Sequence, residues 1–261
     1  MRPGPGSVGR AAVVFDLDGT LIDSVRADFL ACTALFEECG AAFVPDFWAE
    51  RVCGNTGGYP ALFAVLRERA AVDLTDAALR ERLAAQWARF FTPEHVGLLP
   101  GAGALLDELR ACGVPLGLAS SSDREWVDRW LGHFGLAGHF AATVAGDEVA
   151  RRKPDPAVYR AATARLGVPP SWCVAVEDSP TGTAAAAAAG CTVLAVRTAL
   201  LRQLRYPHAD HVVPDLFAVR RLLIGPESAA AAPPRAGRVR EPHQSAPEAS
   251  ARPKPTKDVR T

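Results

Sequence analysis

Two aspartates, Asp16 and Asp18, follow a short apolar run in the stretch "VVFDLDGTLIDS" (13–24). Side chains two residues apart on an extended strand point to the same side, so this spacing predicts that the two carboxylates lie close together. Like charges at short distance are costly unless a cation lies between them or one carboxyl binds a proton. The pair therefore predicts a bound cation or a protonated carboxyl at this position.

More polar side chains follow other apolar runs. Ser120, Ser121 and Ser122 follow one run, and Glu177 and Asp178 end another. In an open parallel sheet, ligands bind beyond the carboxyl ends of the strands, so we expect these side chains to gather with the aspartate pair. Oxygen ligands without His or Cys favour a hard cation, and Mg²⁺ before Ca²⁺ or zinc.

Three other nucleotide- or metal-binding motifs are disfavoured. An EF-hand needs Gly at position six and Glu at position twelve, whereas "DLDG" has Gly19 fourth and Ala27 twelfth. No GxxxxGK[ST] occurs, so an ATP-type P-loop is absent. The stretch "GAGALL" at Gly101 lacks a preceding strand and a third glycine, which argues against a dinucleotide site.

Lys153 is the only lysine outside the C-terminal segment, in a chain that otherwise uses arginine. This exception favours a site that needs a compact ammonium group rather than a planar guanidinium. It lies in the loop "RRKPDP", after a strand-like run. Ser179 as N-cap and Pro180 as first helical residue predict a helix that begins beside Asp178 and ends at Gly190. Together, Mg²⁺, a lysine, a hydroxyl and a helix N-terminus describe a phosphoryl-binding site.

The fold class follows from apolar runs that alternate with helical periodicity. Such runs indicate a parallel sheet covered on both faces, that is, a doubly wound α/β fold. The expected strands are 11–16, 115–120, 141–146, 173–178, 191–197 and 211–215. We also expect a helix over 100–110 and a second one capped by Asp123.

Residues 23–96 contain helical spacing but no convincing strand, which predicts an inserted helical domain. Its aromatic residues, Trp87 among them, are interpreted as packed core. We expect an α/β core domain over 11–22 and 97–224, a helical cap over 23–96 and a disordered tail over 225–261. A loop in the cap either reaches the substrate or merely joins two helices. Its candidate residues are Arg51, Asn55, Thr56 and Tyr59.

Composition indicates an ordinary globular protein that acts on a small solute. Lys plus Arg and Asp plus Glu are 29 each, so no net field favours a nucleic acid or a membrane surface. The apolar runs are shorter than the ~18 residues that cross a bilayer, and the first ten residues do not resemble a secretory signal. We expect a cytoplasmic monomer or weak dimer, with its six scattered cysteines as buried free thiols.

These residues resemble the haloacid dehalogenase-like superfamily, in particular its phosphoglycolate phosphatase and β-phosphoglucomutase-like members with a helical cap. The resemblance covers about 11–215 and includes four motifs in order: "DLDGT", the strand ending in Ser120, Lys153 and "VEDSPTG". It implies a phosphatase that hydrolyses a small-molecule phosphate monoester through an aspartyl-phosphate.

The resemblance also implies a role for each motif residue. Asp16 would be the nucleophile and Asp18 the acid and base. The expected Mg²⁺ ligands are Asp16, the backbone carbonyl of Asp18, and Asp178. The expected phosphate-binding residues are Gly19, Ser120, Ser121 and Lys153. Glu177 is expected to lie behind the metal ligands.

Two other functions stay open. A phosphosugar mutase of the β-phosphoglucomutase type usually has a His shortly after "DS", and "DSVRADF" has none. A metal-binding module without catalysis would leave the acid pair without a purpose. A sugar phosphate, phosphoglycolate or a specialised-metabolite phosphate would each fit as substrate.

Overall fold

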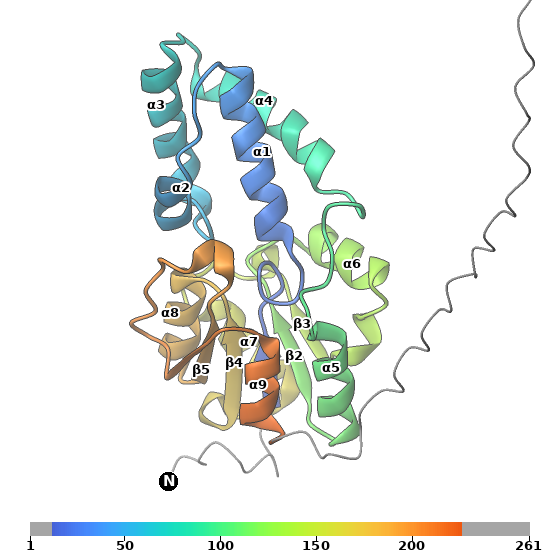
Figure 1. The fold of residues 1–261 in the computed structure, drawn as a ribbon. Helices are drawn as coiled ribbons and strands as arrows, with labels where there is room; N and C mark the ends of the chain where they lie inside the picture. The colour runs from blue at the N-terminus through green and yellow to red at the C-terminus, as the bar shows by residue number, and fades with distance from the viewer. Residues whose placement is uncertain (1–11, 226–261) are drawn as a thin grey trace, which may run out of the picture. The chain divides into compact units, whose positions relative to one another are not determined.

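The computed structural model describes residues 12–225 and contains a six-stranded parallel sheet (Figure 1). The strand order is β3-β2-β1-β4-β5-β6. The strands are β1 (Ala12–Phe15), β2 (Leu116–Ala119), β3 (Ala142–Val144), β4 (Cys173–Glu177), β5 (Thr192–Val196) and β6 (His211–Val213). All six lie within the predicted strand segments, and the predicted α/β class is confirmed.

The two faces of the sheet carry different helices because the strands alternate their side chains. On β1, Val13 and Phe15 pack against α5 (Ala102–Ala111), α6 (Arg124–His133) and α9 (Leu216–Leu223). Ala12 and Val14 face α7 (Ala157–Leu166) and α8 (Pro180–Ala189) instead. Both faces are buried, which explains why the strands read as continuous apolar runs.

Helix α8 begins beside the carboxyl end of β4, as predicted. The Ser179 hydroxyl accepts a hydrogen bond from the Gly182 amide at 3.0 Å, and Pro180 is the first helical residue. The helix ends at Gly190, whose φ of 97° favours glycine. The alanines of α8 let it lie close to β4 and β5.

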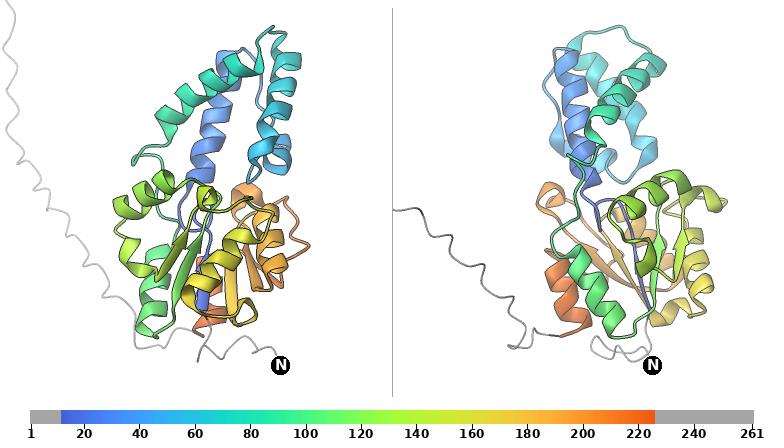
Figure 2. Two further views of the ribbon diagram at one scale, coloured as in Figure 1. Left: turned by 180° about the vertical axis from the view of Figure 1, so that it is seen from behind. Right: turned by 90° about the vertical axis from the view of Figure 1, so that its right-hand side faces the viewer.

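Four helices lie between β1 and α5 in the chain, and Figure 2 shows them together beyond the carboxyl ends of the strands. They are α1 (Ser24–Glu38), α2 (Pro45–Arg51), α3 (Tyr59–Ala70) and α4 (Asp76–Phe90). They share an apolar cluster that includes Phe36, Trp48 and Leu83 and that extends to Leu201 and Tyr206 after β5. These helices match the periodicity predicted for 23–96. The exact domain boundaries, 11–22 with 97–224 against 23–96, stay a prediction.

Two predictions about helix starts need correction. The predicted helix over 100–110 begins later, at Ala102, after Gly101 with a φ of 87°. Asp123 precedes α6 but makes no side-chain capping bond, because its carboxylate pairs with Arg152.

The cysteines are less uniformly buried than predicted. All six are free, but Cys112 is exposed, and Cys39 and Cys53 are only partly buried. Within residues 12–225, no helix is long and apolar enough to cross a membrane. The predicted tail, 225–261, lies outside the described residues except for Gly225.

Candidate active site

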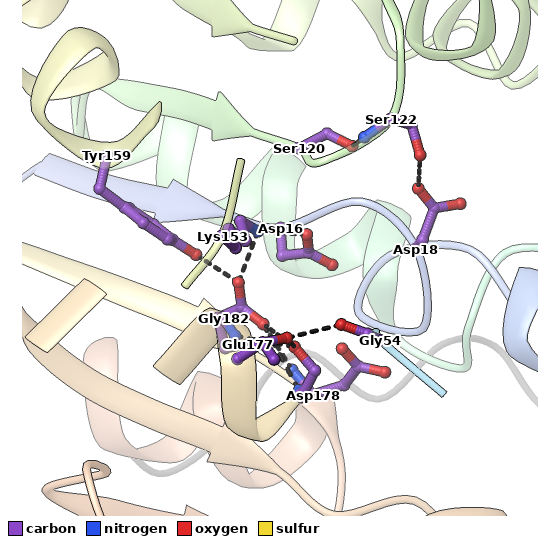
Figure 3. Close-up of polar contacts among 12 residues, drawn as sticks. Asp16, Asp18, Gly54, Ser120, Ser122, Lys153, Tyr159, Glu177, Asp178 and Gly182 are labelled. Carbon is purple, nitrogen blue, oxygen red and sulfur yellow. Dashed lines mark hydrogen bonds and ion pairs between the residues drawn. The ribbon is translucent and has the colours of Figure 1, made fainter. Parts of the chain in front are cut away.

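The site lies where the strand order reverses, between β1 and β4. Asp16 follows β1, Glu177 ends β4, and Asp178 follows it. One carboxylate oxygen from each of these three residues lies within 4.8 Å of the others, and all three side chains are buried (Figure 3). The predicted meeting of strand ends therefore brings three carboxylates together.

Lys153 lies among these carboxylates. Its Nζ is 2.6 Å from Asp16 Oδ1 and 2.6 Å from Glu177 Oε1. Burial works to lower the pKa of Lys153, but the two carboxylates outweigh it and raise the pKa above its ordinary value. Lys153 is therefore a fixed positive charge between the first and fourth strands.

Glu177 is occupied by protein donors on both oxygens. Oε1 accepts from Lys153 and from the Tyr159 hydroxyl at 2.7 Å, and Oε2 accepts from the Ser179 hydroxyl at 3.2 Å. A Cβ on Gly182 would lie 2.0 Å from the Glu177 carboxyl carbon, so only glycine fits there. Glu177 thus holds Lys153 in place, and its position behind the metal ligands stays a prediction.

Asp16 and Asp178 have oxygens left to offer. Asp16 Oδ2 is buried without a hydrogen-bond partner, and no hydrogen bond among the described residues reaches the Asp178 carboxylate. Burial raises the pKa of Asp16 to about 7, partly offset by Lys153. Burial, and then the charge of Asp16, also raise the pKa of Asp178. Two buried carboxylates that each have an oxygen without a hydrogen-bond partner fit a hard divalent cation.

Gly19 makes this approach of the two strand ends possible. Its φ is 82°, in the left-handed region that favours glycine, and a Cβ there would lie 2.0 Å from Asp178 Oδ2. The "DLDG" turn therefore needs glycine for both conformation and space.

The carboxylate of Asp18 is turned away from the Asp16 cluster. Strand β1 ends at Phe15, so the alternation that predicted one shared spot stops before both aspartates. Asp18 instead accepts hydrogen bonds from three donors across the cavity. They are the Ser24 hydroxyl at 2.8 Å, the Ser122 hydroxyl at 2.7 Å and the Trp126 indole at 2.9 Å.

The serines after β2 differ in accessibility. The Ser120 side chain is fully buried, and its Oγ accepts from the Ser122 amide at 3.0 Å. Ser121 and Ser122 line the cavity. The loop after β2 thus brings hydroxyl groups to the site, and Figure 3 shows the Ser122 hydroxyl bonded to Asp18.

A cavity of about 290 Å³ joins this site to helices α1, α3 and α4 and to the loop that follows α2. Asn55 and Tyr59 of the candidate loop line it, whereas Arg51 is exposed and does not, and the Thr56 side chain is not described. The Gly54 carbonyl accepts from the Thr181 hydroxyl of α8 at 2.7 Å. The loop therefore reaches the site rather than only joining two helices.

Several residues of the cavity and of the groups behind it were not recognised from the sequence. Trp87 packs against the apolar cluster of the insertion, as predicted, but it also lines the cavity, as does Trp126. Asp28 on α1 and Tyr159 on α7 were not singled out. An aspartate within an apolar helical stripe was the one available signal for Asp28, while nothing local marks Tyr159.

Comparison with known proteins agrees with this geometry. A family model described as haloacid dehalogenase-like hydrolase matches residues 13–196. A phosphoglycolate phosphatase from Rhodospirillum rubrum is 36% identical over 187 residues, 70% of this chain and 78% of the relative. A validoxylamine A 7'-phosphate phosphatase from Streptomyces hygroscopicus subsp. limoneus is 33% identical over 215 residues, 82% of this chain and 97% of the relative.

A solved structure is similar over nearly its whole length. It is a HAD family hydrolase from Deinococcus radiodurans R1 with bound phosphate and sodium. It is 27% identical, has a TM-score of 0.68, and the match covers 85% of this chain and 99% of that one.

The fold and the matches define the class of protein: the chain belongs to the haloacid dehalogenase-like hydrolases. The predicted family is confirmed, and the relatives support the predicted class of enzyme, a phosphoric monoester hydrolase.

Proposed function

We propose that this protein is a Mg²⁺-dependent phosphatase that hydrolyses a small-molecule phosphate monoester through an aspartyl-phosphate on Asp16. The observation that carries the proposal is the buried Asp16 oxygen without a partner, beside a fixed lysine and a second unpaired carboxylate. An oxygen in this state is available either to a cation or to a phosphorus atom.

Asp16, Asp178 and the backbone carbonyl of Asp18 would hold Mg²⁺, which would position the phosphoryl group and offset its charge. Lys153 offsets charge on the same oxygens, and the loop of Ser120 and Ser121 binds the phosphoryl oxygens beside the Gly19 turn. Their combined charge makes the phosphorus accessible to a carboxylate nucleophile.

Catalysis would proceed in two displacements. An Asp16 oxygen attacks phosphorus, the bond from phosphorus to the leaving oxygen breaks, and Asp18 donates a proton to that oxygen. Water then attacks the aspartyl-phosphate and gives a proton to Asp18, which frees Asp16 and inorganic phosphate. Asp18 suits the role of acid and base because Ser24, Ser122 and Trp126 hold it at the cavity side of the site.

A phosphosugar mutase is the less favoured alternative. No histidine lines the described cavity, and the residues of α1 that line it are Ser24, Val25 and Asp28. The relatives named above are a phosphoglycolate phosphatase and a validoxylamine A 7'-phosphate phosphatase, so relatives share hydrolysis but not the alcohol. We further propose residues 23–96 as a cap that selects the substrate, and the cytoplasm as the location.

The test is hydrolysis of p-nitrophenyl phosphate by the purified chain with Mg²⁺ and with chelator. We expect turnover that stops on chelation, and a phosphoenzyme that is trapped on wild type but absent from Asp16→Asn. Full activity in chelator would remove the metal assignment. Turnover by Asp16→Asn at the wild-type rate would remove the covalent mechanism.

A further inference from the structure

Asp28 is a buried carboxylate that the proposed reaction does not use. It lies on α1, is 9% exposed, and lines the same cavity as Asp16. One donor from each of the other three cap helices reaches it: the Trp48 indole at 2.8 Å, the Tyr59 hydroxyl at 3.0 Å and the Trp87 indole at 2.7 Å.

These contacts stabilise the charged form of Asp28 and so partly offset the burial that raises its pKa. Indole N–H groups can only donate, so Trp48 holds Oδ2 and Trp87 holds Oδ1 as acceptors. Oδ2 accepts from Trp48 alone among the described residues, which leaves it capacity for one more donor. None of the ion pairs within residues 12–225 involves Asp28, so its charge has no cationic partner.

The charged residues that line the cavity are mostly acidic, which also favours a cationic ligand. Four carboxylates line it, namely Asp16, Asp18, Asp28 and Asp178. Lys153 is the only lysine or arginine among the described lining residues, and Asp16 and Glu177 already pair with it. The end of the cavity away from the strands therefore has a negative charge and no positive one.

A row of aromatic rings lines the cavity between Asp28 and the proposed acid and base, Asp18. The ring centroids of Tyr59 and Trp87 are 5.3 Å apart, those of Trp87 and Phe91 6.2 Å, and those of Phe91 and Trp126 4.9 Å. All four rings line the cavity, and Trp126 donates to Asp18. Rings of this kind, with a carboxylate at one end, are the surroundings that bind organic cations.

We propose that Asp28 and this aromatic wall select a phosphate monoester whose alcohol carries an ammonium group. The inference rests on the proposed phosphatase function and names its substrate class. An ammonium donates a charge-assisted hydrogen bond to Asp28 and makes cation–π contact with the rings. An alcohol with a carboxylate or second phosphate would find no cation in the cap part of the cavity, so anionic substrates are disfavoured.

The test uses matched substrates and the Mg²⁺-loaded enzyme. A series of ω-aminoalkyl phosphates of two to six carbons is paired with alkyl phosphates that carry a methyl in place of the ammonium, and with ω-carboxyalkyl phosphates. At the best chain length we expect kcat/KM to favour the ammonium substrate about tenfold or more over its methyl counterpart. The carboxylate counterpart should be the poorest of the three.

Asp28→Asn separates selection from a structural role. If Asp28 only ties the cap helices together, the variant lowers kcat/KM equally for both members of a pair, and their ratio is unchanged. If Asp28 binds the ammonium, the ratio of kcat/KM for the ammonium substrate to that for the methyl substrate falls toward one. A smaller fraction of folded protein lowers both values equally and does not change this ratio. Asp46→Asn, an exposed neutralisation on α2, should keep the wild-type ratio.

The outcomes also separate this inference from the proposed function. Hydrolysis of p-nitrophenyl phosphate with an ammonium-to-methyl ratio near one at every chain length would overturn the ammonium proposal and leave the phosphatase intact. No hydrolysis of any ester would overturn both. If Asp28→Asn does not fold, the proposal is tested on wild type by comparing inhibition of turnover by ω-amino alcohols with inhibition by the corresponding alkanols. Inhibition no stronger than that by the corresponding alkanols would then overturn the proposal.

Discussion

Asp16 and Asp18 are two residues apart but lie in opposite surroundings. Asp16 has a lysine on one oxygen and nothing on the other, while Asp18 has three neutral donors and no cation in contact. A carboxylate with a free oxygen can act as nucleophile, and one held by hydroxyl and indole groups can exchange a proton. The environment therefore assigns the two steps to different residues.

Asp18→Asn tests this division at the residue scale. An amide keeps the acceptor toward Ser24 and Trp126 and can donate to the Ser122 hydroxyl, so we expect the fold to survive. The rate should fall roughly 10²–10⁴-fold for alkyl phosphates, the usual contribution of positioned proton transfer. The loss should be smaller for p-nitrophenyl phosphate, because p-nitrophenolate departs without a proton. Equal losses for both leaving groups, measured as kcat, would contradict the acid role.

At the scale of elements, one side chain links the four helices of the insertion. Asp28 of α1 contacts α2, α3 and α4 through Trp48, Tyr59 and Trp87. Burial raises the pKa of Asp28, and bonds from these three residues and from Cys32 only partly offset it. The folded protein therefore holds this proton at a higher pH than the unfolded chain does.

The consequence is a pH-dependent contribution of Asp28 to stability. Where the folded pKa is raised, the native state binds more protons, so the free energy of unfolding falls as pH rises from the unfolded pKa near 4 through the folded pKa. We expect the unfolding free energy of wild type, minus that of Asp28→Asn, to decrease as pH rises over this range. Urea denaturation in chelator from pH 4 to pH 7 measures it. An increase of this quantity, wild type minus Asp28→Asn, with pH would contradict the raised pKa.

The sequence predicted those features of the structure that depend on residues close together in the chain. The strands, the Ser179 cap and the meeting of Asp16, Lys153 and Asp178 followed from apolar runs and from the rule that ligands bind at strand ends. The cavity wall did not follow, because Trp87 and Trp126 have helical spacing typical of core. Only the packing of α4 and α6 around the site turns these rings toward a cavity, and no local pattern encodes that.

For the molecule as a whole, the sheet edge concentrates negative charge that folding must bury. Asp16, Glu177 and Asp178 lie together with one lysine, which leaves net repulsion in the metal-free protein. A bound divalent cation would relieve that repulsion and would bind the folded state alone, so metal affinity and global stability are coupled.

Asp178→Asn should therefore change stability in opposite directions without and with metal. In chelator, removal of one buried charge should leave the melting temperature equal to or above that of wild type, because repulsion from Asp16 and Glu177 is lost. At about a hundredfold excess of Mg²⁺ over its dissociation constant, wild type should gain roughly 5–10 °C, and Asp178→Asn clearly less. Thermal unfolding followed by circular dichroism measures both, with Asp46→Asn as the control that should respond as wild type does. An Asp178→Asn protein that gains as much as wild type would show that the cation does not depend on this carboxylate, and the ligand assignment at the end of β4 would have to be abandoned.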